Sequence, residues 1–285
     1  MQQICDLHAH SHFSDGTDSP TQLLQKAQAA GISALALTDH NTVAGLPEFL
    51  AAAEGSTVTA VPGVEISTEY NNVELHIVGL FLKPAYWAQV TDYLATINIR
   101  KEQSSRALIK SLCEAGYPLD YDEVKAQHHG VVNRAVIAGA MLQKGYITTI
   151  GEAFRGLLSE TNGVYVPPKR IPSLEAVDFL RSVQAVPVLA HPFLNLGEAD
   201  MVRFIQLAKP CGLAAMETLY STYSDATTAD AQRIAQTCGL LQSGGSDYHG
   251  GPKPDIALGT GRGSLAVPLS ICEALREYHG MGSKT

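Results

Sequence analysis

Residues 3–40 have the sequence QICDLHAHSHFSDGTDSPTQLLQKAQAAGISALALTDH, which predicts a strand, a helix and a second strand. Apolar runs at the two ends of this stretch are typical of buried strands. Between them, Ser19 suits a helix cap, Pro20 suits the first helical position and Gly31 suits the C-terminal stop. Strands that alternate with helices form parallel sheets, so we expect an α/β protein.

The same alternation returns later in the chain. Further strand-like runs follow, at 56–67, 72–82, 185–192, 212–221 and 239–250. Together with the first two they give about seven strands, of which the fourth is hairpin-like. Residues 84–163 show only helical patterns, and we interpret them as a helical insertion that caps the site. A chain of 285 residues suits one α/β barrel, here built from residues 1–83 and 164–285.

Composition excludes several functional classes. With 45% hydrophobic and 17% charged residues the chain is globular, and it has neither a membrane-spanning apolar run nor an export signal. We therefore expect a cytoplasmic protein without a membrane partner. The net charge of -8 counts against an extended nucleic-acid-binding surface but allows a small anionic ligand. The five cysteines form no Cys-x-x-Cys pair, so any metal would be held by histidines and carboxylates.

Chemically distinctive residues gather at the ends of the predicted strands and in the loop after the first strand. They are His8, His10, Asp15, His40, Glu65, His76, His191, Asp247 and His249. In a barrel of parallel strands these ends open onto one face, where barrel enzymes carry their chemistry. One such histidine alone is more often a packing residue. Nine converging polar groups would be costly to desolvate without a partner, and a metal cluster satisfies them together.

The first strand ends in a run of histidines that differ in their expected roles. Residues two apart in a strand point the same way, so His8 and His10 can both face the mouth of the barrel. Residues 11–16 have the composition of a turn, which directs His12 away from that face. Asp15 can fold back from this loop over the site, and we expect it, rather than His12, to be a ligand.

Six motifs in this chain resemble those of the PHP (polymerase and histidinol phosphatase) phosphoesterases, a family of amidohydrolase-like barrels. They are DLHAHSHFSDG, LALTDHNTVAG, VPGVEIS, LHIVGLF, VLAHP and GGSDYHG, in the family's order and over nearly the whole chain. The resemblance implies a distorted seven-stranded (β/α) barrel. It also implies up to three divalent metal ions, most often manganese, with zinc or iron as alternatives.

Carried over position by position, the resemblance assigns each candidate ligand to an ion. The first ion would be held by His8, His10, Glu65 and Asp247. Glu65 would bridge to a second ion held by His76 and His191. The third would be held by Asp15, His40 and His249. Asp39 and Asp6 would orient ligands from behind, a common role for carboxylates near metal-bound imidazoles.

The insertion contains a stretch similar to one in the nucleotide-acting branch of the family. There the motif is often Gly-Arg-Pro-His-Ile-Ala; here Arg134 and the Ile-Ala pair are kept, whereas Asn133, Ala135 and Val136 differ. Arg134 at a helix start could hold a phosphate through two hydrogen bonds. The segment YVPPKR at 165–170 also matches that branch and makes Lys169 a second candidate phosphate ligand, with Arg170 a weaker one. Ser67 shares the face of Glu65 if the strand continues, and it could donate to a phosphate oxygen.

These features predict a metal-dependent phosphoesterase. Three divalent ions would bring six positive charges, and Asp15, Glu65 and Asp247 return three negative ones, so the site stays cationic and suits a phosphate dianion. The substrate implied is a phosphorylated nucleotide, most simply the 3′-phosphate of a 3′,5′-bisphosphonucleotide, or the 5′ end of a short RNA. A hydroxide on the metals would attack phosphorus. His191, Arg134 and Asp247 would take part in catalysis, with His191 or a metal-bound water as the acid.

Two other interpretations stay open. Hydrolysis of histidinol phosphate is the alternative within the family, and the insertion with Arg134 and YVPPKR counts against it. A non-catalytic metal-binding accessory module is the alternative from another class. All nine ligand positions are kept and no polymerase portion is present, which counts against the module. The sequence predicts no particular oligomeric state.

Overall fold

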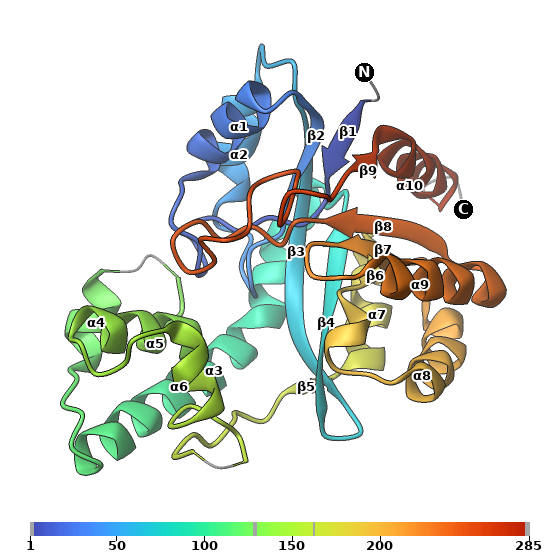
Figure 1. Cartoon of the computed structure of the whole chain (residues 1–285). Helices are drawn as coiled ribbons and strands as arrows, with labels where there is room; N and C mark the ends of the chain where they lie inside the picture. Colours follow the sequence, from blue (N-terminus) through green and yellow to red (C-terminus); the bar gives the residue numbers. More distant parts are fainter. Residues whose placement is uncertain (1–2, 128–129, 162, 283–285) are drawn as a thin grey trace.

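The computed structural model describes residues 3–127, 130–161 and 163–282, and its strands form one sheet (Figure 1). In chain order the strands are β1 (Ile4–Asp6), β2 (Ile32–Leu37), β3 (Thr59–Tyr70), β4 (Val73–Leu80), β5 (Ile171–Pro172), β6 (Val186–Leu189), β7 (Ala215–Tyr220), β8 (Leu241–Gly245) and β9 (Val267–Pro268). Their order in the sheet is β8-β7-β6-β4-β3-β2-β1-β9, and β5 pairs with β3. β4 is antiparallel to both of its neighbours, whereas β1–β2–β3 and β6–β7–β8 are parallel.

The sheet curves toward a barrel because the chain after β1 pairs with the end of β8. The N–H of Leu7 donates to the carbonyl of Gly244 at 3.1 Å, and the N–H of Asp247 donates to the carbonyl of His8 at 2.8 Å. Gly245 permits this approach, since a Cβ there would lie 2.5 Å from the Cβ of His8. The α/β class and the barrel-like sheet are therefore confirmed.

The predicted count of seven strands is not confirmed. The described residues form nine strands, eight along one path with β5 beside β3. β5 and β9 pair over two residues each, too short for any apolar alternation to reveal them in the sequence.

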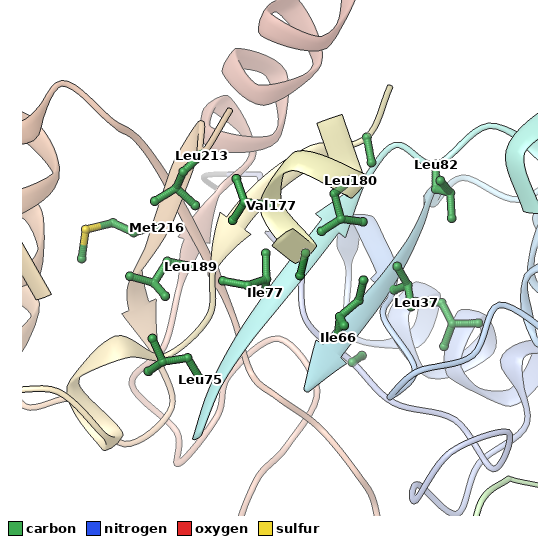
Figure 2. Packing of buried hydrophobic residues seen from close by; sticks show 14 of the residues in the cluster. Leu37, Ile66, Leu75, Ile77, Leu82, Val177, Leu180, Leu189, Leu213 and Met216 are labelled. Atoms are coloured by element: carbon green, nitrogen blue, oxygen red, sulfur yellow. The ribbon is translucent and has the colours of Figure 1, made fainter. Parts of the chain in front are cut away.

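The described residues form ten α-helices, of which most cover the outer face of the sheet and those of the insertion lie beside it. They are α1 (Pro20–Ala29), α2 (Leu46–Ala53), α3 (Trp87–Glu114), α4 (Tyr121–Ala126), α5 (Arg134–Gln143), α6 (Ile150–Arg155), α7 (Ser173–Ser182), α8 (Glu198–Cys211), α9 (Asp225–Cys238) and α10 (Leu269–Gly282), with 3-10 turns at Pro84–Tyr86 and Pro192–Leu194. α1 begins as predicted, with Ser19 in a capping box and Pro20 in the first turn. In the core, Ile66 of β3 and Ile77 of β4 pack near Val177 and Leu180 of α7 (Figure 2). No helix among the described residues combines the length and apolarity needed to cross a bilayer.

The hairpin of β3 and β4 changes the position expected for Glu65. We expected Glu65 to end its strand, but β3 continues to Tyr70 because it stays paired with β4 over eight residue pairs. Glu65 therefore lies in mid-strand, and Ser67, opposite His76, shares its face as predicted. Since β4 runs in the opposite direction, His76 near its start lies at the same end of the sheet as the carboxyl ends of the parallel strands.

The segment from α3 to α6 has a hydrophobic core of its own beside the barrel (Figure 1). The first half of α3 packs into the barrel core through Val90, Leu94 and Ile97, whereas its second half packs with α4, α5 and α6. α3 therefore joins the two cores, and the N-terminus of α5 contacts the loop after β1 through Asn133.

Candidate metal centre and adjoining cavity

Glu65 lies at the centre of a cluster of buried histidines. Its Oε1 is 2.8 Å from Nδ1 of His76 and 3.1 Å from Nε2 of His191. Its Oε2 is 3.2 Å from Nε2 of both His8 and His10. One carboxylate from mid-strand β3 thus faces imidazoles from the end of β1, from β4 and from the end of β6.

Asp247, after β8, approaches the same two histidines of the first motif. Its Oδ1 lies 3.6 Å from Nε2 of His8 and 3.2 Å from Nε2 of His10. The hydroxyl of Tyr220 donates to Oδ2 at 2.7 Å, and the ammonium of Lys253 does so at 2.6 Å. One carboxylate oxygen is therefore held by donors, and the other faces the imidazoles.

Asp15 folds back over the cluster from the loop after β1. Its Oδ1 is 3.2 Å from Nε2 of His249 and 4.0 Å from Nδ1 of His10, and its Oδ2 is 3.8 Å from Nε2 of His40. The side-chain amide of Asn133, which caps α5, donates to Oδ2 of Asp15 at 3.0 Å. The insertion thus touches the predicted ligand set directly.

All nine predicted ligands fall into groups that could each hold an ion. Within each group the nitrogen and oxygen atoms lie within 4.8 Å of one another. The groups are His10–Asp15–His40–His249, His8–Glu65–His191, His8–His10–Asp247 and His40–Glu65–His76. His12 belongs to none of these groups among the described residues.

The cluster fits divalent cations on physical grounds. Four buried side-chain atoms there lack a hydrogen-bond partner in the described structure: Nδ1 of His10, Oδ1 of Asp15, Nδ1 of His40 and Oε2 of Glu65. Each unsatisfied buried polar atom costs about 1–3 kcal/mol, and cations among these atoms would satisfy them together. Imidazole and carboxylate donors without thiolates suit borderline to hard divalent ions.

The protonation states of two carboxylates and two histidines of the cluster suit metal binding. Burial favours neutral carboxyl groups, yet the surrounding histidines hold the pKa values of Glu65 and Asp15 well below the usual range. Burial lowers the pKa values of His40 and His249, which favours their neutral forms. Ionised carboxylates and neutral imidazoles are the forms that bind metals.

A second layer of carboxylates holds the ligands from behind. Glu217 in β7 accepts from Nδ1 of His8 at 2.7 Å and from the backbone N–H of His191 at 2.6 Å. Asp39 instead holds the loop that carries Asp15, because Ser11 and Ser14 donate to its two oxygens.

Asp6 lies below the first motif and organises backbone. Its carboxylate accepts from the N–H groups of His8, Ser246 and Gly259. Asp6 and Asp39 therefore lie behind the cluster, where they accept hydrogen bonds from the segments that carry ligands.

Two of the predicted ligands have unusual backbone conformations. His191 has φ 29° and Asp247 has φ 55°, values that non-glycine residues rarely adopt. Such conformations cost about 1–3 kcal/mol each and persist only where the surroundings enforce them. Here the backbone N–H of His191 donates to Glu217, and the backbone N–H of Asp247 donates to the carbonyl of His8. The two strand ends are thereby turned toward the cluster.

A cavity of about 500 Å³ extends from the cluster to the underside of the insertion. Asp15, His40, His76, His191 and Asp247 lie at one end. Apart from histidines, the side chains of cationic and aromatic character that line it are Lys101, Arg134, Phe154, Tyr165, Arg170, Tyr220 and Lys253. The cavity thus connects a histidine–carboxylate cluster with a group of cations, which suits a ligand with more than one anionic group.

A family model described as the PHP domain matches residues 6–162 of the chain. The chain belongs to the PHP domain family. The matched span covers β2, β3, β4 and most of the insertion, including Asp15, Glu65 and Arg134. The predicted family resemblance is therefore confirmed.

Several relatives of this PHP chain have names that refer to RNA or nucleotides. A 5′-3′ exoribonuclease of Haemophilus influenzae is 32% identical over 87% of this chain and 91% of its own. A 3′,5′-nucleoside bisphosphate phosphatase of Chromobacterium violaceum is 29% identical over 86% of each chain. Among solved structures, an amidohydrolase from Chromobacterium violaceum superimposes with a TM-score of 0.82 at 28% identity, covering 86% of this chain and 87% of that one.

The predicted phosphate ligands of this PHP chain lie at different distances from the cavity. Ser67 and Arg134 line it. The position of Lys169 does not favour its predicted role as a phosphate ligand, because its side chain is exposed and does not line the cavity. Its neighbour Arg170 is buried and lines the cavity instead, since consecutive residues of an extended segment point to opposite sides.

Two lysines of the cavity were missed by the sequence analysis. Lys101 on α3 donates to Oγ of Ser67 at 3.0 Å, and Lys253 pairs with Asp247. Neither lies in a recognisable motif: Lys101 is one cation within a long mixed helix, and Lys253 follows His249 in a glycine- and proline-rich loop. Only their proximity to the ligand cluster distinguishes them from ordinary surface lysines.

Proposed function

We propose that this PHP chain is a divalent-metal-dependent phosphatase of nucleotides, which removes the 3′-phosphate from 3′,5′-bisphosphonucleotides. The observation that carries the proposal is the shared cavity, which Arg134 and Arg170 line together with five of the nine predicted ligands. One phosphate of the substrate would lie at the cluster and the other at the arginine pair. The name of the Chromobacterium violaceum relative supports this substrate class.

The nine predicted ligands would hold up to three divalent ions, with manganese as our first choice. When bound, such ions lower the pKa of coordinated water and offset the charge that develops in phosphoryl transfer. The chain itself supplies the positions: Ser67 and Lys101 line the cavity as a hydrogen-bonded pair and would donate to oxygens of the reacting phosphate. His191, at the cavity wall, stays our candidate proton donor for the leaving oxygen.

The contacts of Arg134 favour a role in binding the second phosphate. Its guanidinium lies over the ring of Tyr165, 4.5 Å from the ring centroid, and its Nη2 contacts Glu74 at 3.2 Å and Glu160 at 3.0 Å. These contacts fix the guanidinium at the cavity wall and lower the entropy lost when it binds phosphate. Asp247, held by Tyr220 and Lys253, would keep its free oxygen toward the cluster.

Removal of nucleotides from the 5′ end of a short RNA is the second candidate function. It is favoured by the exoribonuclease of Haemophilus influenzae, which is 32% identical over most of both chains. A terminal phosphate at the arginine pair would place the adjoining phosphodiester toward the cluster, in the same orientation as a bisphosphonucleotide. The two activities would then share one site and differ only in whether the reacting phosphorus also carries the next nucleotide of an RNA.

A release assay for inorganic phosphate with Mn²⁺ present tests the proposal. The substrates are 3′,5′-bisphosphoadenosine, 5′-AMP, 3′-AMP and histidinol phosphate, and a 5′-phosphorylated RNA is followed separately by gel. We expect the bisphosphate to react with the highest kcat/KM among the small substrates. Equal turnover of 3′-AMP and the bisphosphate would contradict a role for the second phosphate, and preferred turnover of histidinol phosphate would contradict the substrate class.

A further inference from the structure

Glu74 connects the candidate metal cluster with the arginine pair. It lies two residues before His76 on β4, so both side chains point to the same face and line the cavity. Its Oε1 lies 3.5 Å from Nε2 of His76. Its Oε2 accepts from Nη2 of Arg170 at 2.8 Å and of Arg134 at 3.2 Å. One carboxylate therefore contacts a predicted metal ligand and both arginines.

The two nitrogens of His76 have different partners. Nδ1 faces Glu65, the central carboxylate of the cluster, at 2.8 Å, and Nε2 faces Glu74. A carboxylate behind a metal-binding imidazole selects its tautomer, fixes the ring and makes it a better ligand. Glu74 is placed to act on His76 in this way.

The arginines depend on the same residue. Glu74 and Glu160 both contact Nη2 of Arg134 and Nη2 of Arg170, so two carboxylates hold two guanidiniums at the cavity wall. If Glu74 shifts, both the ring of His76 and the guanidiniums lose a fixed partner.

We propose that Glu74 is a positioning residue that ties metal affinity at His76 to phosphate recognition by Arg134 and Arg170. The part of this inference that concerns phosphate recognition, the phosphate half, rests on the function proposed above. The part that concerns metal affinity, the metal half, rests only on the contacts among Glu74, His76 and Glu65. Binding at either site then favours the arrangement that the other site requires, because both use the same carboxylate.

The chain contains matched controls for this role. Glu160 contacts the same two guanidiniums, and Glu69 lies 3.9 Å from Nη1 of Arg170. Among the ion pairs of the described residues, those of Glu160 and Glu69 involve arginines only. Each substitution removes one negative charge near the cavity, but Glu74→Ala alone also removes the partner of His76.

The experiment measures Mn²⁺ binding to the metal-free protein by calorimetry, together with KM for 3′,5′-bisphosphoadenosine. The variants are Glu74→Ala, Glu74→Gln, Glu160→Ala and Glu69→Ala, with His76→Ala to identify the affected metal site. We expect Glu74→Ala to weaken Mn²⁺ binding about 10- to 100-fold at the site that His76→Ala abolishes, and to raise KM. Glu160→Ala should raise KM with Mn²⁺ affinity unchanged, and Glu69→Ala should leave Mn²⁺ affinity unchanged.

Glu74→Gln keeps an oxygen that can accept from the imidazole, so it should recover most of the metal affinity. Circular dichroism and melting temperature check that each variant is folded, and Glu74→Met, which also removes the acceptor for His76, replaces Glu74→Ala if that variant is not folded. Wild-type Mn²⁺ affinity in Glu74→Ala would overturn the metal half, as would an equal loss in Glu160→Ala. If the wild type hydrolyses no bisphosphonucleotide, the proposed function and the phosphate half fail while the metal half is judged on calorimetry alone.

Discussion

Nδ1 of His8 lies 2.7 Å from Oε1 of Glu217, behind the face that His8 presents to the cluster. The same carboxylate accepts from the backbone N–H of His191 through its other oxygen. Burial alone would lower the pKa of His8, but Glu217, Glu65 and Asp247 together raise it well above its usual value. One buried acid of β7 thus orients a ring from the end of β1 and a backbone turn after β6.

Glu217→Gln should weaken metal binding because a carboxamide has only one acceptor oxygen and cannot accept from both Nδ1 of His8 and the backbone N–H of His191. We expect about a 10- to 100-fold loss of Mn²⁺ affinity or of kcat/KM, as for other residues behind metal ligands. The loss of Mn²⁺ affinity is measured as the metal content of the protein after dialysis against limiting Mn²⁺. Glu198→Gln, on the exposed side of α8, is the control. Unchanged metal content in Glu217→Gln would show that Glu217 serves the fold only.

Arg134→Ala should affect substrate rather than metal. Loss of a charge-assisted contact to the second phosphate should lower kcat/KM for 3′,5′-bisphosphoadenosine about 10- to 100-fold, with a much smaller effect on 3′-AMP. Steady-state kinetics on the two substrates measure the difference, and elemental analysis gives the metal content. A loss of metal in this variant would assign Arg134 a structural role instead.

Lys101→Met should separate activity from stability. Burial lowers the pKa of Lys101, and its hydrogen-bond partner is the neutral hydroxyl of Ser67, so an apolar side chain of similar length should fit at little cost. We expect an unchanged or higher melting temperature together with about a tenfold or greater loss of kcat/KM, since the cation for the reacting phosphate is gone. A variant with full activity would remove Lys101 from the proposed site.

Metal binding should strengthen as pH rises from 6.5 to 9. Burial would lower the pKa values of His10 and His76, but neighbouring carboxylates raise each to about 9 in the metal-free fold. These imidazoles must then release protons to bind metal, so the apparent Mn²⁺ affinity should rise up to about tenfold per pH unit for each proton released. Calorimetric titrations in two buffers of different ionisation enthalpy give the number of protons released when Mn²⁺ binds. A flat affinity over this range would contradict the assignment of these ligands.

The metal-free protein should show the opposite trend in stability. The folded-state pKa values near 9 exceed the ordinary value of 6.5, so proton binding favours the fold. This stabilisation is complete below about pH 6.5 and is lost as pH rises through 9. We expect the melting temperature of the chelator-treated protein to fall over that range, and saturating Mn²⁺ to raise it at every pH. A metal-free melting temperature that rises from pH 6.5 to 9 would contradict this expectation.

The sequence by itself predicted the α/β class, the capped first helix, the helical segment after residue 83 and the PHP family. These features follow from local patterns: apolar runs, the Ser19–Pro20 start of α1, and motifs in which the chemical residues adjoin strands. The alternation of side chains along a strand also predicted that His8 shares a face with His10, and Glu65 with Ser67.

The remaining features of the site depend on contacts between segments that are far apart in the chain. Glu65 lies in mid-strand because β4 pairs along the full length of the hairpin, and Arg170 rather than Lys169 faces the cavity because of how the segment after the insertion lies. Lys101, Lys253 and Glu74 belong to no motif, and they gain a role from residues far away in the chain that fold against them. The alternation of side chains along a strand determines the face on which a residue lies, whereas packing between distant segments determines which residues that face contacts.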